Sequence, residues 1–545
     1  MTDLLIRGGT VVDGTGGPAR RLDLAIAGSR IAALGREAAD EPARRVIEAD
    51  GLVVAPGFID MHSHADFTLP SYPGAHNSLA QGVTSEVIGN CGYSPAPVAL
   101  DPALADEQRA ACNGLGPDLA WDWTTFAEYL DRLDAARPAV NCIALVGHGM
   151  LRLASVGAGA RAASEAETTA MQALVVDALA AGAWGMSTGL VYPPGAYAST
   201  DEIVAVGRGL VAADALYASH IRDETDGVAG ALAEAVEIGR RLGVRVQVSH
   251  LKTAGLKNHG RAAEALAILA AGRAAGGRVT HDAYPYTAGS TLLTQLLPHW
   301  VQDGGTAAII ARLGSAEVRA RIASEVRDGL PGWNNYLQSS GGPDQVLIAA
   351  VTDPALSWLE GQTLAQAAAT AATDPLNLVF DTIVADRAST TMIVSLMAER
   401  DVDRILDDPL TAIGSDQLGV LAPETRVHPR AYGSFVRILG QYVRDRQRLD
   451  LVAAIHRMTG LPAEILGLRD RGVIAPGAIA DLVVFDPATV ADTSTYASPT
   501  TAPLGVENVL VGGRIATERG RLVDVGLGRV LRRTINGRRP PHRSS

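Results

Sequence analysis

Two histidines separated by one residue, His62 and His64, come soon after an apolar run at residues 52–56. The run predicts a buried strand. In an extended chain the side chains at positions i and i+2 point the same way, so both imidazoles would face one spot. Two neutral imidazoles that converge in this way could bind a metal ion such as zinc. A lone His-x-His pair is more often a pair of surface or core residues, so the rest of the chain decides between these interpretations.

Four further residues that could carry metal or acid–base chemistry stand at the ends of other strand-like runs. They are Cys91, His220, His250 and Asp416, which follow residues 87–90, 215–219, 246–249 and 412–415. In a (β/α)8 barrel the carboxyl ends of the strands form the face on which active sites are built. Four imidazoles and a thiolate suit zinc best, and a thiolate can bridge two metal ions. A carboxylate beside them could ligate, or act as general base and then general acid.

Strand-like runs alternate with long amphipathic stretches through the middle of the chain. Strands are expected at 140–146, 183–187, 215–219, 245–249, 278–282 and 410–415, and helices at 124–136, 163–181, 200–213, 227–242 and 260–275. This order predicts an α/β fold, with a parallel sheet closed into a (β/α)8 TIM-like barrel. A Gly-rich stretch at about 287–350, with two tryptophans, breaks the rhythm and predicts an insertion over the barrel mouth.

Short strands with tight glycine turns occupy both ends of the chain. Hairpins are predicted at 4–12, with a Gly8-Gly9 turn, and at 22–34, and strands return at 480–486 and 506–514. Each β segment is too small to bury a core alone, so the two are expected to form one discontinuous β domain. The predicted boundaries are 1–56 and 465–533 for the β domain, 57–464 for the barrel, and 534–545 for a disordered tail.

The composition of the 545-residue chain limits its partners. A formal net charge of -12 argues against a nucleic-acid partner, which usually needs a basic face. No run approaches the roughly 18 apolar residues of a membrane span, and no signal peptide is visible at the start. Three cysteines do not suggest a disulfide framework. We therefore expect a cytoplasmic protein with no membrane partner, whose oligomeric state the sequence leaves open.

Eight stretches resemble the amidohydrolase superfamily and, more narrowly, the D-aminoacylases (N-acyl-D-amino-acid deacylases). They are 57–67 (GFIDMHSHADF), 89–97 (GNCGYSPAP), 189–200 (GLVYPPGAYAST), 219–224 (SHIRDE), 249–252 (SHLK), 282–291 (DAYPYTAGST), 414–416 (GSD) and 428–440 (HPRAYGSFVRILG). These stretches run in the family's order across almost the whole chain, and the closing pattern at 471–487 is similar too. The resemblance implies zinc-dependent hydrolysis of N-acyl-D-amino acids, which cleaves a linear amide C–N bond to give a carboxylate and a free D-amino acid.

The resemblance also implies how the metal is held. Cys91, His220 and His250 would bind one zinc ion tightly. His62 and His64 would line a second, weaker metal position, and Cys91 would be able to bridge the two.

A second group of residues is implied to act on the substrate. Asp416 would be the catalytic acid/base. Lys252, Tyr284 and Ser290 would hold the carboxylate of the small-molecule substrate. Two residues on matching motifs would line the same pocket: Tyr192 and Arg222.

The scarcity of lysine offers an independent check, because the chain has lysine only at Lys252 and Lys257. Many two-metal amidohydrolases bridge their metals with a carboxylated lysine on an early-to-middle barrel strand. No lysine precedes Lys252, so that bridge cannot be built in the usual place, and Cys91 is the available substitute. This disfavours the hydantoinase and dihydroorotase branch of the superfamily.

Three alternative functions stay open at this stage. The first is hydrolysis of another amide, peptide-like or cyclic. The second is metal-dependent deamination. This reaction normally needs a further His or Glu pair that acts on a ring nitrogen of the substrate, and the sequence shows no clear candidate for such a pair. The third is a silent binding protein, which the presence of all six candidate residues disfavours. The side chain preferred also stays open, because a D-aspartate or D-glutamate preference would need a basic partner that the sequence does not place.

Overall fold

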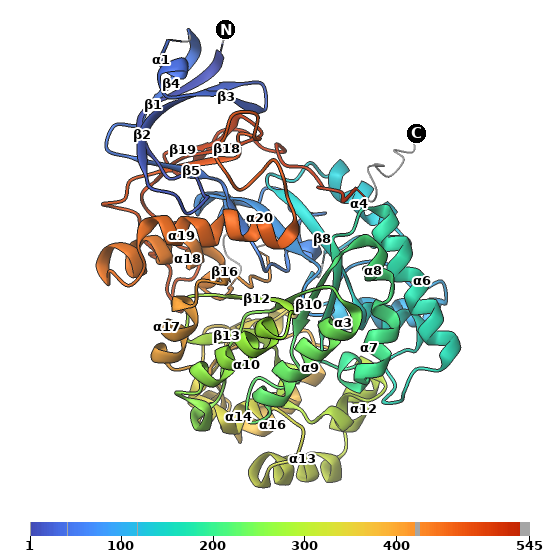
Figure 1. The fold of residues 1–545 in the computed structure, drawn as a ribbon. Helices are drawn as coiled ribbons and strands as arrows, with labels where there is room; N and C mark the ends of the chain where they lie inside the picture. The colour runs from blue at the N-terminus through green and yellow to red at the C-terminus, as the bar shows by residue number, and fades with distance from the viewer. Residues whose placement is uncertain (1, 41, 117, 420–425, 535–545) are drawn as a thin grey trace.

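The computed structural model describes residues 2–40, 42–116, 118–419 and 426–534 (Figure 1). One of its sheets is parallel and has eight strands, in the order β16-β12-β11-β10-β9-β8-β7-β6. The strands are β6 (Phe58–Asp60), β7 (Val83–Ile88), β8 (Asn141–Gly147), β9 (Gly185–Gly189), β10 (Leu216–His220), β11 (Arg245–Val248), β12 (Arg278–Ala283) and β16 (Thr411–Ile413). The N–H of Met61 donates to Ile413 O, and the N–H of Asp416 donates to His62 O. These bonds join β6 to β16, so the sheet closes and the predicted barrel is confirmed.

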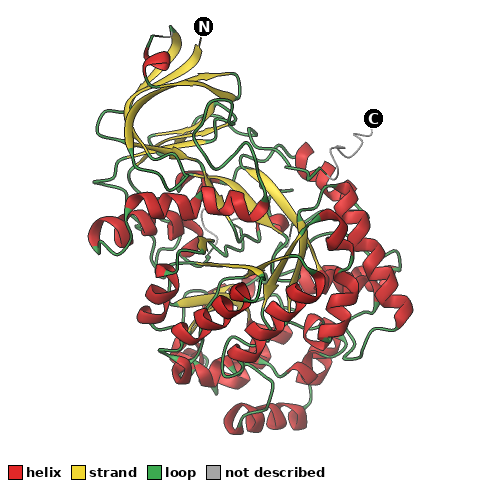
Figure 2. Cartoon of the chain, in the orientation of Figure 1, coloured by secondary structure: helices red, strands yellow, loops and turns green. Residues whose placement is uncertain are grey.

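Helices on the outside of the sheet connect successive barrel strands, as the alternating pattern predicts (Figure 2). Among them are α4 (Phe126–Ala135), α6 (Glu165–Ala181), α9 (Val228–Leu242) and α10 (Ala262–Ala274). Helix α6 begins at a capping box made by Ser164 and ends at Gly182, whose φ of 113° favours glycine. The single helix expected at 200–213 is two helices, α7 (Thr200–Gly207) and α8 (Gly209–Ala213), because two glycines weaken the helix at this point.

Between β12 and β16 the chain forms a three-stranded antiparallel sheet. Its order is β13 (Ala288–Leu292), β15 (Thr391–Ser395), β14 (Val346–Ala350). Strand β15 pairs with both neighbours, so the insertion expected at about 287–350 continues to residue 395 at least. The intervening helices have the length and pattern of barrel helices, which is why the sequence alone ends the insertion too early.

The strands of the two chain ends form one nine-stranded sheet, at the upper left of Figure 1. They are β1 (Thr2–Val11), β2 (Arg20–Ala27), β3 (Arg30–Leu34), β4 (Ala43–Glu48), β5 (Val53–Pro56), β17 (Leu482–Phe485), β18 (Val506–Val511), β19 (Arg514–Glu518) and β20 (Arg521–Leu522). Strands β5 and β17 pair antiparallel, and this contact joins the two ends of the chain. The small discontinuous β domain expected from the sequence is therefore confirmed.

Gly8 and Gly9 do not form the predicted hairpin turn, because they lie within the continuous strand β1. The register of β1 against β2 shifts between Ile6 and Gly9, which marks a β-bulge. Gly8 has a φ of 73°, and its N–H donates to Asp23 Oδ1 at 2.7 Å. Strand β1 pairs with β4 before the bulge and with β5 after it. The glycines thus let one strand change partners, and the hairpin prediction is wrong.

The predicted tail at 534–545 lies outside the described residues from residue 535 onward. Within the described part of the chain, no helix combines the length and the hydropathy that a membrane crossing requires. Strand β5 is followed after Gly57 by β6, so the β domain leads directly into the strand that precedes His62 and His64.

Candidate metal centre and active site

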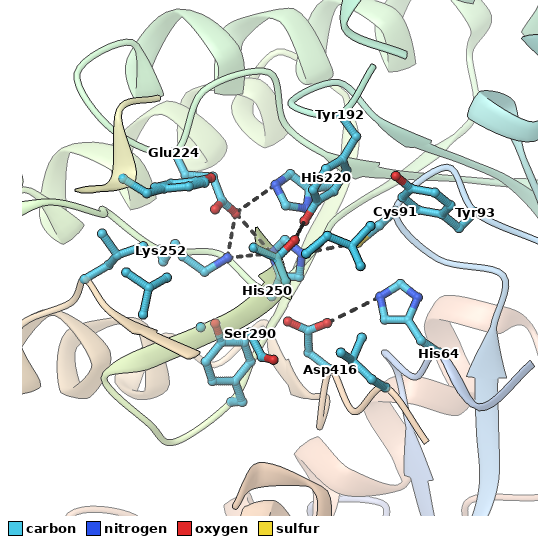
Figure 3. A pocket seen from close by; sticks show the side chains of 18 of the residues that line it. His64, Cys91, Tyr93, Tyr192, His220, Glu224, His250, Lys252, Ser290 and Asp416 are labelled. Atoms are coloured by element: carbon cyan, nitrogen blue, oxygen red, sulfur yellow. Dashed lines mark hydrogen bonds and ion pairs between the residues drawn. The ribbon is translucent and has the colours of Figure 1, made fainter. Parts of the chain in front are cut away.

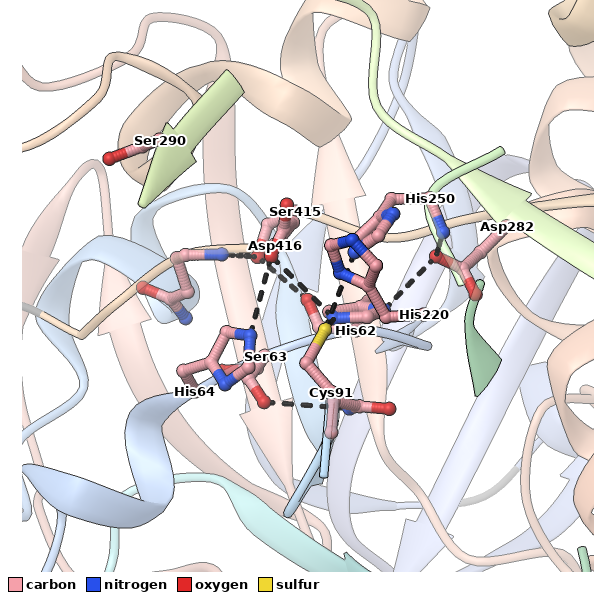
Figure 4. A network of polar contacts seen from close by, with 12 residues as sticks. His62, Ser63, His64, Cys91, His220, His250, Asp282, Ser290, Ser415 and Asp416 are labelled. Carbon is pink, nitrogen blue, oxygen red and sulfur yellow. Dashed lines mark hydrogen bonds and ion pairs between the residues drawn. The ribbon is translucent and has the colours of Figure 1, made fainter. Parts of the chain in front are cut away.

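All six candidate metal and acid–base residues lie at the carboxyl ends of barrel strands and are buried (Figure 4). They follow or end β6, β7, β10, β11 and β16, and they are His62, His64, Cys91, His220, His250 and Asp416. The structure therefore brings to one face of the barrel residues that are as much as 354 positions apart in the chain.

Cys91 lies between two histidines. Its Sγ is 3.2 Å from His62 Nε2 and 3.3 Å from His250 Nε2. Burial by itself raises the pKa of a thiol, but His62 and His250 hold the pKa of Cys91 well below its ordinary value. Cys91 is therefore poised as a thiolate, the form in which cysteine binds metal.

Three overlapping groups of side chains have ligand atoms close enough to surround a metal ion, with all atoms of a group within 4.8 Å of one another. The first is His62, Cys91 and His250. The others are His62, His64 and Asp416, and His220, Glu224 and His250. Because the groups share His62 and His250, they form one continuous cluster and not three separate sites.

The backbone at this cluster is held in an uncommon conformation. Cys91, His250 and Asp416 have φ values of 54°, 34° and 53°, in the left-handed region that non-glycine residues rarely adopt. Each such residue costs on the order of 1 kcal/mol and persists only where the surroundings fix it. Gly89 helps to fix Cys91, since a Cβ added at Gly89 would lie 2.0 Å from Leu145 O.

Two carboxylates that the sequence reasoning missed stand behind the histidines. Glu224 Oε1 lies 3.4 Å from His220 Nε2 and 3.2 Å from His250 Nδ1. Asp282 Oδ1 lies 3.3 Å from His62 Nδ1 and accepts the backbone N–H of His250 at 2.8 Å. A carboxylate behind a histidine orients the ring and makes its other nitrogen a better ligand. Both acids fall inside the quoted motifs, but only the fold shows which histidine each one contacts.

Asp416 is the acid at the mouth of the cluster. Its Oδ1 lies 3.4 Å from His64 Nε2 and 3.6 Å from His62 Nε2, while its Oδ2 lies 2.7 Å from Arg430 Nη1. Burial raises the pKa of a carboxyl, but Arg430 and the nearby histidines hold the pKa of Asp416 well below its ordinary value. Arg430 was also missed from sequence, although it lies in the stretch 428–440. Asp416 is thus kept ionised and able to accept a proton.

A cavity opens over this cluster (Figure 3). Four residues expected to contact substrate line it: Tyr192, Lys252, Tyr284 and Ser290. The insertion contributes directly, because Ser290 lies on β13 and Val394 on β15. The buried hydroxyl of Tyr284 has no hydrogen-bond partner among the described residues, which leaves it available to a ligand.

Arg222 is the one expected substrate residue that the structure does not bring to the cavity. Its guanidinium donates to both carboxylate oxygens of Glu234, at 2.9 and 2.8 Å. It also donates to the backbone oxygens of Ala196 and Ala198, each at 2.9 Å. These contacts use four of the five N–H groups of the guanidinium, so Arg222 holds the loop at 195–199 in place and does not line the cavity.

The donor set suits zinc. Nδ1 of His220 and Nδ1 of His64 are buried without a hydrogen-bond partner among the described residues. Such atoms are costly unless something that the protein does not itself supply satisfies them. Imidazole nitrogens beside a thiolate are the ligands that zinc prefers.

Comparison with known proteins agrees with this geometry. The profile of the amidohydrolase family matches residues 45–517, most of the chain. The chain belongs to the amidohydrolase family. Over 94% of its length it is 40% identical to N-acyl-D-aspartate deacylase from Alcaligenes xylosoxydans xylosoxydans, of which it covers 92%. It is also 39% identical to the D-aminoacylase of that organism, and 98% of each chain is covered.

A solved structure shares the whole architecture. It is N-acyl-D-glutamate deacylase from Bordetella bronchiseptica, complexed with zinc and a phosphonate inhibitor that mimics the tetrahedral intermediate. The two chains are 38% identical, with 97% of this chain and 99% of the other covered and a TM-score of 0.82. The resemblance to the D-aminoacylases inferred from sequence motifs is therefore confirmed.

Proposed function

We propose that the protein is a zinc-dependent deacylase that hydrolyses N-acyl-D-amino acids to a carboxylate and a free D-amino acid. The observation that carries this proposal is one cavity in which a buried His/Cys cluster, the ionised Asp416 and the donors of Lys252, Tyr284 and Ser290 all converge. The names of the similar deacylases, and the zinc and phosphonate in one of them, support it.

Cys91, His220 and His250 would hold one zinc ion, and His62 and His64 would line a second, weaker position. The proximity of Cys91 Sγ to both His62 and His250 supports a bridging thiolate. When bound, zinc acidifies the attacking water and polarises the acyl carbonyl.

Asp416 moves the proton in both halves of the reaction. Its carboxylate accepts the proton of the water as the oxygen attacks the acyl carbon. It then donates that proton to the amide nitrogen as the C–N bond breaks, which makes the amine a neutral leaving group. The Arg430 contact at Oδ2 keeps Oδ1 directed at His62 and His64, where the reacting groups would meet.

The α-carboxylate of the substrate would sit against Lys252, Tyr284 and Ser290. The free hydroxyl of Tyr284 and the ammonium of Lys252 can both donate hydrogen bonds to it, and the ammonium also carries the opposite charge. With this end fixed and the amide carbon held near Asp416, the Cα substituents have fixed directions, and only one enantiomer places its side chain in the remaining space. The wall formed by these donors would therefore distinguish the D from the L enantiomer of the substrate.

The organisation and location of the chain belong to the same proposal. We place the β domain at residues 1–56 and 465–533 and the catalytic barrel at 57–464. A cytoplasmic location agrees with three free and buried cysteines, which a reducing compartment allows.

Release of free amine from N-acetyl-D-methionine and N-acetyl-L-methionine by zinc-loaded protein tests the proposal. We expect release from the D substrate, and loss of release in Asp416→Asn with zinc retained. Equal release from the L substrate would contradict the chirality claim. Absence of release from both, with zinc bound, would contradict the proposed reaction.

A further inference from the structure

The charges around the cavity are already paired. Lys252 is the one lysine or arginine among the described residues that line it, and its Nζ lies 2.6 Å from Glu224 Oε1. Arg430 approaches from beneath, with its Nη1 2.7 Å from Asp416 Oδ2 and its guanidinium 4.7 Å from the ring centre of Tyr284. The α-carboxylate of a substrate would sit against Lys252, and the described residues that line the cavity include no second lysine or arginine for another carboxylate.

Away from the metal cluster and the substrate donors, most of the lining is apolar or aromatic. It includes Tyr93, Leu115, Leu292, Tyr336, Val394, Leu396 and Leu418. Leu292 also lines a neighbouring cavity together with Tyr93. Figure 3 shows Tyr93 on the opposite side of the cluster from Lys252. Both the acyl group and the side chain of a substrate anchored at Lys252 would therefore meet apolar surface.

The nearest other arginines are held elsewhere. The guanidinium of Arg222 donates hydrogen bonds to Glu234 and to two backbone oxygens. Arg426 lines an adjoining cavity that shares Leu115, Ser290 and Leu418 with the first, and it packs against Gly361. Arg430 lines that adjoining cavity too but is paired with Asp416, so Arg426 is the cation there that a longer acidic side chain would have to reach.

We infer that this cavity selects N-acyl-D-amino acids whose side chain is uncharged and apolar, of the size of methionine or leucine, over those of aspartate and glutamate. The inference rests on the proposed function. A thioether or isobutyl group would bury its surface against the leucines with a gain in free energy. A side-chain carboxylate would lose its water without gaining a cation, which is costly in a buried site. Sequence similarity does not decide the matter, because the aspartate deacylase and the D-aminoacylase are 40% and 39% identical to this chain.

The test compares N-acetyl-D-methionine with N-acetyl-D-glutamate, whose side chains have similar length, on the zinc-loaded full chain. We expect kcat/KM for the methionine substrate to exceed that for the glutamate substrate by at least ~100-fold. Calorimetric titration with the products should show tighter binding of D-methionine than of D-glutamate. Equal or faster hydrolysis of the glutamate substrate would overturn the inference but leave the proposed function standing. No hydrolysis of either substrate would overturn the proposed function, and the inference with it.

Three variants test the physical reason for the preference. Leu115→Arg places a cation on the apolar wall and should move the methionine-to-glutamate ratio toward glutamate by ~10-fold or more, whereas the size-matched Leu115→Met should keep the ratio. Arg426→Met should leave the ratio unchanged. A loss of glutamate hydrolysis in Arg426→Met would show that the adjoining cavity recognises acidic side chains, and would overturn the inference.

Discussion

Replacement of Glu224 by glutamine should loosen zinc without unfolding the protein. Glu224 is buried, and its Oε1 contacts three groups at once: His220 Nε2 at 3.4 Å, His250 Nδ1 at 3.2 Å and Lys252 Nζ at 2.6 Å. For His250 to offer Nε2 to a metal, its Nδ1 must carry the proton and needs an acceptor. A lysine ammonium cannot accept, so Glu224 has to supply that acceptor.

The size of the effect follows from these contacts. Removing a carboxylate behind a metal-binding histidine typically costs 10- to 100-fold in metal affinity, which corresponds to about 1.4–2.7 kcal/mol. Glu224→Gln keeps the shape and an acceptor oxygen but loses the charge. Burial lowers the pKa of Lys252, and the Glu224 carboxylate more than offsets this. In the variant the pKa of Lys252 should therefore fall, and KM for the substrate carboxylate should rise.

Competition with a chromophoric chelator measures the zinc affinity of the wild type and of Glu224→Gln. The matched control is Glu237→Gln, an exposed carboxylate paired with Arg240 on helix α9, which should bind zinc as the wild type does. Thermal unfolding of the metal-free proteins checks that the fold is intact. An unchanged zinc affinity in Glu224→Gln, in folded protein, would refute the role assigned to this carboxylate.

Three further outcomes are expected. Tyr284→Phe removes a hydroxyl that has no partner among the described residues, so KM should rise ~10-fold with little change in the melting temperature; an unchanged KM would remove Tyr284 from the substrate site. Glu202→Gln breaks a buried ion pair with Arg152 and should lower the free energy of unfolding at pH 7 by about 3 kcal/mol, measured in urea. Burial raises the pKa of Glu202, but His148 and Arg152 lower it by more, so its pKa lies below 4.5 in the folded protein. The difference in unfolding free energy between wild type and variant should therefore shrink as the pH falls below 4.5. A difference that does not change with pH would contradict the ion pair as its cause. Asp60 accepts the backbone N–H groups of His62 and Ser415, and Asp60→Asn weakens these hydrogen bonds. We expect kcat to fall while KM stays unchanged. A fall in zinc affinity as large as the fall in kcat would mean that Asp60 instead supports the metal.

The elements that local pattern specifies could be predicted from the sequence. Barrel strands such as β8 and β10 are short apolar runs, and helices such as α9 carry an apolar stripe and end at a glycine, so both appear within a residue or two of their predicted places. The carboxyl ends of parallel strands meet at one face of a barrel, so the predicted strand ends placed the histidines, Cys91 and Asp416 on that face.

What the sequence could not supply depends on contacts between distant segments. Glu224, Asp282 and Arg430 look like ordinary charged residues until the fold sets them against His250, His62 and Asp416. Arg222 is the converse case, since it sits in a motif yet turns away because Glu234, on helix α9, attracts its guanidinium. The extent of the insertion was hidden for the same reason, as only pairing shows that β15 belongs with β13.

Anomalous diffraction at the zinc absorption edge, from crystals of protein loaded with zinc, tests the central claim most directly. We expect a strong peak among His62, Cys91, His220 and His250, with Asp416 facing it. A second, weaker peak beside His64 would match the weaker position. Zinc found only at surface residues, with this cluster intact and free of anomalous signal, would contradict the metal site and the reaction proposed from it.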